Sequence, residues 1–134
     1  MEVKFNVSTL QRPEGVRILD APLVSIDLFS FLKKIKKEKK WKETDRNAIT
    51  VFKTNGMRIV LIALRKGAEM VKHSADGKIS IQVLKGKIQL NTDVQSINLG
   101  KGRMLALHEG IPHNLLAKKK TVFLLTLTTT LAED

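Results

Sequence analysis

The sequence predicts an all-β barrel or jelly roll that follows one N-terminal helix. Short apolar runs recur at close spacing after residue 47, and no long helical pattern separates them. Asn55-Gly56 and Asp76-Gly77 are strong hairpin signals between such runs. The expected strands cover residues 48–53, 57–64, 69–73, 79–83, 87–90, 96–99, 103–107, 114–117 and 121–128.

The composition fits one domain with an aliphatic core. The chain has 134 residues, of which 43% are hydrophobic, but only five are Phe, one is Trp and none is Tyr. A core built from Ile, Leu and Val favours strands. There is no cysteine, which excludes disulfides, thiolate metal sites and cysteine nucleophiles. We expect one structural domain, with an N-terminal arm and basic helix in residues 1–46 and the barrel in residues 47–134.

The N-terminal region divides into an extended arm and a helix. Residues 2–7 alternate polar and apolar side chains, as a half-buried strand does. Residues 25–40 show helical spacing, and Ser25 or Asp27 is the expected N-cap. The apolar stripe of this helix consists of Leu28, Phe31, Leu32 and Ile35.

The net charge of +11 suggests anionic partners. The lysine-rich stretch 33–42 has two interpretations, a nucleic-acid contact or a solvated helix face. We favour the solvated face, and disfavour nucleic acid as a partner, because Arg is scarce, Trp41 is the one stacking aromatic and no groove-reading motif is present. Lys118-Lys119-Lys120 is interpreted as a turn. We find neither an apolar leader nor a membrane-spanning run, so we expect a cytoplasmic protein without a membrane partner.

Two segments carry a resemblance to a known family. Residues 67–86 read GAEMVKHSADGKISIQVLKG, and residues 102–117 read GRMLALHEGIPHNLLA. They resemble the two motifs of small single-domain cupins (RmlC-like jelly rolls), G-x5-H-x-H-x3-4-E-x6-G and G-x5-P-x-G-x2-H-x3-N. The resemblance covers residues 47–128 and implies the cupin double-stranded β-helix. The matching positions are Gly67, His73, Gly86, Gly102, Gly110 and His113.

The sequence departs from the motifs at four positions. His108 stands in place of the proline of the second motif and Ala117 in place of its final asparagine, and the other two departures concern the metal site. The resemblance implies that three histidines and one glutamate project into the barrel and hold a divalent ion. His73 and His113 occupy two of these positions, whereas Ala75 and Ile79 occupy the other two. A catalytic metal site normally uses about three protein ligands. We therefore expect no metal cofactor. If one is present, its ligands would be His73 and His113 with a third donor, Glu69 or His108.

Glu69 shares the strand parity of His73, so we expect it to point inward near the rim of the pocket. His108 precedes a glycine turn and is interpreted as a surface loop residue. These two side chains and Glu109 are the candidate third donors, at unknown distances.

The leading hypothesis for function is a non-catalytic cupin that binds a small molecule in its barrel, with an acidic or hydrogen-bonding group on the ligand. Two alternatives stay open: a metal-dependent oxygenase- or isomerase-type enzyme with an altered ligand set, and a basic interaction or nucleic-acid-binding module. The resemblance also suggests a homodimer, formed through the sheets or by exchange of the N-terminal arm. The expected ligand-binding residues are His73, His113, Ala75, Ile79, Ile81 and Leu115.

Overall fold

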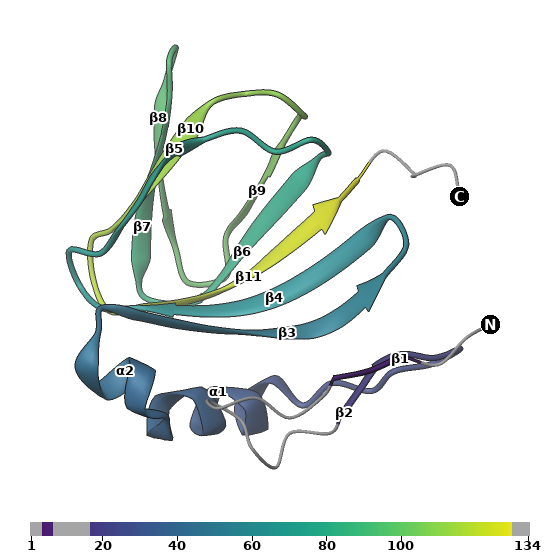
Figure 1. The fold of residues 1–134 in the computed structure, drawn as a ribbon. Helices are drawn as coiled ribbons and strands as arrows, with labels where there is room; N and C mark the ends of the chain where they lie inside the picture. Colours follow the sequence, from purple (N-terminus) through teal and green to yellow (C-terminus); the bar gives the residue numbers. More distant parts are fainter. Residues whose placement is uncertain (1–3, 7–16, 130–134) are drawn as a thin grey trace.

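The computed structural model describes residues 4–6 and 17–129; for residues 4–6, Lys72 and His73 it describes the backbone alone. Two antiparallel sheets face each other around the core, and two short helices lie outside the larger sheet (Figure 1). The larger sheet has the order β3-β4-β11-β6-β9 and the smaller has the order β5-β10-β7-β8. The strands are β1 (Lys4–Asn6), β2 (Arg17–Asp20), β3 (Arg46–Thr54), β4 (Met57–Leu64), β5 (Glu69–His73), β6 (Ile79–Lys85), β7 (Lys87–Thr92), β8 (Ser96–Gly100), β9 (Met104–Leu107), β10 (His113–Ala117) and β11 (Thr121–Thr128).

The nine strands predicted after residue 47 correspond to β3 through β11, which confirms the all-β jelly roll. Of the predicted strand 2–7, residues 4–6 are described, and they form β1, which pairs with β2. The prediction of one N-terminal helix was wrong. The chain forms α1 (Leu28–Lys37) and α2 (Lys39–Glu43), because Glu38 between them has an extended backbone with ψ 150°. Asp27 is the N-cap of α1, accepting a hydrogen bond from the Ser30 amide.

The central strands of the larger sheet are buried on both faces. Val60, Ile62 and Leu64 of β4 face the other sheet, whereas Leu61 and Ala63 pack toward the helices. The sequence of such a strand is a continuous apolar run, here IVLIAL in residues 59–64, and not an alternation. The helix side forms a second core, in which the buried members are Ile35, Trp41, Ile49, Val51, Leu61, Ala63 and Val122.

A buried asparagine attaches the helix pair to β3. Asn47 is 1% exposed, and its side-chain amide donates to the Ile35 carbonyl and to a carboxylate oxygen of Glu38, both at 2.9 Å. The first of these bonds gives the Ile35 carbonyl at the end of α1 a closer donor than the Glu38 amide, which lies 3.4 Å away. Arg65 secures α2 by donating to the Trp41 carbonyl at 2.8 Å, with its guanidinium 4.1 Å from the indole centroid. The two helices are therefore fixed to the barrel by polar as well as apolar contacts.

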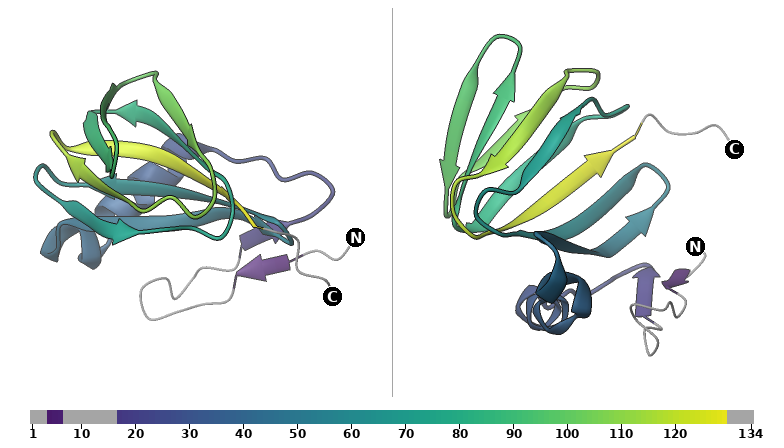
Figure 2. Two further views of the ribbon diagram at one scale, coloured as in Figure 1. Left: turned by 90° about the horizontal axis from the view of Figure 1, so that it is seen from above. Right: turned by 60° about the vertical axis from the view of Figure 1, so that its left-hand side comes forward.

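The turns of the barrel alternate between its two ends, because consecutive strands run in opposite directions (Figures 1 and 2). The β4–β5, β6–β7, β8–β9 and β10–β11 turns gather at the end nearer α2. The β3–β4, β5–β6, β7–β8 and β9–β10 turns lie at the opposite end. No helix among the described residues is both long and apolar enough to cross a membrane.

Gly86 allows the β6–β7 and β10–β11 turns to approach each other closely. Its φ is +91°, a conformation that side-chain-bearing residues rarely adopt. A Cβ at this position would lie 2.3 Å from the carbonyl oxygen of Lys120. Only glycine satisfies both requirements, so the Gly86 position of the motif is explained by backbone packing.

We expect Asn47→Ala to lower the free energy of unfolding by about 2 to 3 kcal/mol, because it removes two hydrogen bonds of a buried side chain, one to the Ile35 carbonyl and one to the Glu38 carboxylate. Urea denaturation followed by circular dichroism measures the change. Asn98→Ala, on an exposed strand position, is the control and should cost less than about 0.5 kcal/mol. Equal effects of the two substitutions would contradict the anchoring role of Asn47.

Candidate ligand cavity

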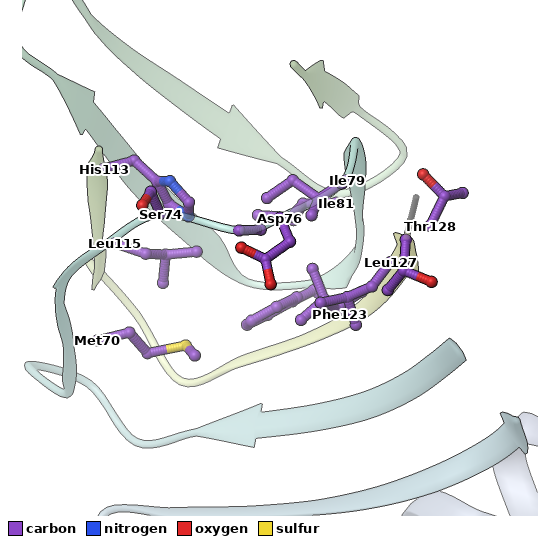
Figure 3. A pocket seen from close by; sticks show the side chains of 14 residues that line it. Met70, Ser74, Asp76, Ile79, Ile81, His113, Leu115, Phe123, Leu127 and Thr128 are labelled. Carbon is purple, nitrogen blue, oxygen red and sulfur yellow. The ribbon is translucent and has the colours of Figure 1, made fainter. Parts of the chain in front are cut away.

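A cavity of about 320 Å³ lies between the two sheets (Figure 3). Its walls come from β5, β6, β10 and β11 and from the turn after β5, and it reaches the barrel end that carries the β5–β6 turn. This volume lies at the lower limit of typical small-molecule sites. The lining residues are Met70, Ser74, Ala75, Asp76, Gly77, Ile79, Ile81, His113, Leu115, Phe123, Leu125, Leu127, Thr128 and Thr129.

The register of two neighbouring strands creates the apolar floor. Ile79 of β6 lies opposite Leu127 of β11, and Ile81 lies opposite Leu125. Side chains two residues apart share one face of a strand, so all four point toward the cavity. Leu115 of β10 closes the other side (Figure 3). The structure thus brings Ala75, Ile79, Ile81, His113 and Leu115 together at one cavity, as the sequence analysis expected for their positions.

His113 is the buried polar group of the cavity. It is 4% exposed, and its Nδ1 lies 2.9 Å from the Ile111 carbonyl oxygen. A carbonyl can only accept, so Nδ1 carries the hydrogen, and Nε2 is the acceptor nitrogen of the neutral ring. This bond fixes the ring orientation in the wall of the cavity. His113 is therefore a preoriented polar contact in largely apolar surroundings.

The backbone of His73 lies directly opposite His113. The two residues are register partners in the β5–β10 pair. The side chain of His73 is not among those the structure describes, so its predicted ligand-binding role stays a prediction. Its backbone position is the one that the motif implies.

The expectation that Glu69 points inward was wrong. A bulge shifts the β5–β10 register between His113 and Leu115, so Leu115 pairs with Met70 rather than with Val71. Met70 consequently lines the cavity, while Val71 is 73% exposed. Glu69 instead accepts a hydrogen bond from the Asn114 side-chain amide at 3.0 Å, on the outer face.

His108 lies on the surface, as the turn interpretation predicted. Its side chain is 76% exposed, and its Nδ1 is 3.8 Å from a carboxylate oxygen of Glu109. Glu109 itself pairs with Lys78 at 3.1 Å. The hydrogen bond from Lys78 lowers the pKa of the Glu109 carboxyl. Neither His108 nor Glu109 lines the cavity, so neither provides a third donor beside His113.

The donor set of the described residues does not fit a divalent metal. Hydrocarbon side chains occupy two motif positions, Ala75 and Ile79, and both line the cavity. Within residues 4–6 and 17–129, no three His, Cys, Asp or Glu side chains with described positions are grouped so that they could hold a metal ion. The proposed ligand sets that complete His73 and His113 with Glu69 or His108 lack their third donor.

The sequence analysis missed several lining residues. Phe123, Leu125 and Leu127 alternate along β11, and this period of two would have revealed them. Asp76 was considered only as a turn residue of Asp76-Gly77, yet it lines the cavity (Figure 3). The close packing of this turn explains its glycine, because a Cβ at Gly77 would lie 1.5 Å from the Thr128 carbonyl oxygen.

Comparison with solved structures shows the cupin fold. A conserved protein of unknown function from Streptococcus pyogenes is 22% identical, with a TM-score of 0.67, over 85% of this chain and 94% of its own. A cupin-2 domain protein from Shewanella frigidimarina is 18% identical, with a TM-score of 0.63, over 77% of this chain and 93% of its own. Other cupins of similar size also match. This chain is a small cupin-fold protein.

Enzymes share this fold. Salicylate 1,2-dioxygenase from Pseudaminobacter salicylatoxidans is 20% identical, with a TM-score of 0.56, over 63% of this chain and 26% of its own. At this identity the similarity concerns the fold alone. No model of a protein family matches the chain, and no curated protein matches it.

We expect protein purified without a histidine tag to contain far less than one equivalent of iron, manganese, nickel or zinc, because Ala75 and Ile79 provide no ligand and the described side chains form no group of three donors. Elemental analysis by mass spectrometry measures the content, with the His113→Ala variant analysed beside it. One equivalent of metal in the parent protein and none in the variant would contradict this expectation and support the enzyme alternative.

Proposed function

We propose that this chain is a non-catalytic cupin that binds a small molecule in the cavity between its sheets. The observation that carries the proposal is an apolar cavity whose wall holds one buried, oriented imidazole, that of His113. Mostly apolar walls with a few fixed polar groups are typical of small-molecule sites. The Ile111 carbonyl holds the imidazole in one orientation, so a ligand group that hydrogen-bonds to the ring meets a preoriented contact.

The lining defines the class of ligand. Aliphatic side chains and Phe123 favour a compact, largely apolar molecule with one polar group near His113. An acidic group stays part of the proposal, because imidazolium attracts anions when the pH falls. Asp76 also lines the cavity and repels a second negative charge. We therefore propose a ligand with a single acidic or hydrogen-bonding group.

The enzyme alternative is less well supported. The similarity to the dioxygenase is a similarity of fold, and a fold hosts many unrelated activities. At Ala75 and Ile79 the chain provides no metal ligand. The cavity residues form no described arrangement of nucleophile and base either. The hydroxyl groups of Ser74, Thr128 and Thr129 make no described hydrogen bond to the Asp76 carboxylate or the His113 imidazole. Binding of a small molecule requires neither a set of metal ligands nor a nucleophile with its base.

Two fluorescent probes test the proposal: N-phenyl-1-naphthylamine, which is neutral, and 1-anilinonaphthalene-8-sulfonate, which has the same rings and one anionic group. We expect both to bind with enhanced fluorescence. Ala75→Phe should reduce both affinities at least about tenfold, because the ring occupies the cavity. Val94→Phe is the matched control, since it adds the same ring to a turn residue that is 90% exposed.

The pH dependence tests the acidic group separately. From about pH 8 to about pH 5.5, affinity for the sulfonate should rise while that for the neutral probe stays level, because only the anion gains from protonated histidine. His113→Phe should remove the rise. Binding that is unaffected by Ala75→Phe would overturn the cavity as the site. If the affinity of neither probe changes with pH, the cavity remains the proposed site, but the acidic group of the ligand is excluded.

A further inference from the structure

The positive charge of the barrel is concentrated at one end. The four turns nearer α2 contain no Asp or Glu, whereas the turns at the opposite end include Asp76, Asp93 and Glu109. Arg65 is engaged with Trp41 and Thr44 and is not counted. We define the basic end as the remaining cations of these four turns, the two lysines at the strand ends beside Gly86, and Lys36 of α1: Lys36, Lys66, Lys85, Lys87, Lys101, Arg103, Lys118, Lys119 and Lys120.

Backbone contacts hold the four turns together. The Gly67 amide donates to the Ala117 carbonyl, and the Lys118 amide donates to the Lys87 carbonyl. The Gly102 amide donates to the Val83 carbonyl, beside the β6–β7 turn. These bonds join segments that are up to 50 residues apart in sequence. The cations of the basic end are thus presented by a rigid framework and do not belong to a flexible tail.

Three cations of the basic end, Lys36, Lys85 and Lys120, lie close enough for their charges to repel. Burial and the nearby charges of Lys85 and Lys120 lower the pKa of the Lys36 ammonium. Every turn cation of the basic end is exposed, and no ion pair joins any of them to a described carboxylate. Such repulsion destabilises the free protein, and a polyanion at this surface relieves it.

The carboxylates nearest to the basic end are already engaged. Asp45 accepts from the Arg46 guanidinium at 2.9 Å, and this bond lowers the pKa of the Asp45 carboxyl. Glu43 lies 3.8 Å from Lys39, and Glu69 accepts from Asn114. None of them offsets the charge of the turns.

We propose that the basic end binds the phosphate backbone of double-stranded nucleic acid without sequence preference. Clustered lysines neutralise phosphates and release the counterions that surround them. A duplex has a higher charge density than a single strand, so this effect favours the duplex. Single-strand binding uses exposed aromatic side chains for stacking, and the four turns contain none; Trp41 is 6% exposed beneath Arg65. The same turns contain no apolar tip residue that would insert into a lipid surface.

This surface differs from the helix contact considered in the sequence analysis. Lys36 is the one residue of the stretch 33–42 that belongs to it, and the other members come from turns far apart in sequence. The cavity is lined by the β5–β6 turn, which lies at the end of the barrel opposite the basic end (Figure 1). Nucleic-acid binding is therefore independent of the cavity ligand.

Fluorescence anisotropy with a short labelled DNA duplex of mixed sequence, measured over a series of salt concentrations, tests the proposal. Lys119→Gln/Lys120→Gln should weaken binding at low salt by about tenfold and make the slope of log K against log salt shallower by about 2, because two phosphate contacts are lost. Lys53→Gln/Lys78→Gln is the matched control, since it removes the same charge at the opposite end of the barrel.

The proposal requires that the control bind the duplex within about twofold of the parent protein. Equal losses in the two double variants would overturn it, because net charge alone would then explain the binding. It is also overturned if the duplex is not bound even at low salt, if a single strand of the same length binds more tightly, or if the protein binds phosphatidylserine vesicles and not the duplex.

Discussion

Strict alternation of strand direction is the constraint on which the rest of this structure depends. Because each strand from β3 to β11 reverses the direction of the one before, successive turns go to opposite ends of the barrel. At one end the β5–β6 turn lines an apolar cavity, whereas the turns at the other end carry almost nothing except lysine, arginine and glycine. A small jelly roll of this kind has two chemically different ends. They are connected only through the core that is packed between the two sheets.

The sequence contained enough information for the fold, since hairpin signals and period-two alternation are local properties. It predicted the strands to within a few residues, together with the cavity positions of Ile79, Ile81 and Leu115. It did not predict the break at Glu38, because the side chain that stabilises the break belongs to Asn47, which follows on another element. Long-range side-chain contacts of this type leave no periodic signal.

Two of the errors at the site, those at Glu69 and Met70, have one physical origin. A single-residue bulge in β5 reverses parity, so counting from His73 placed Glu69 on the wrong face and overlooked Met70. The basic end was overlooked for a related reason. Its members are separated by up to 84 positions in the chain, and each short group looks like an ordinary turn. Only the three-dimensional arrangement of the turns reveals that they form one surface.

The junction between helix and barrel also has a spectroscopic consequence. Trp41 is the single tryptophan of a chain without tyrosine, and it packs beneath the Arg65 guanidinium where α2 meets the larger sheet. Intrinsic emission from this protein therefore originates at one defined place, whereas far-ultraviolet dichroism reports the strands as a whole. Comparing the two signals during denaturation distinguishes a helix pair that detaches on its own from one that unfolds together with the barrel.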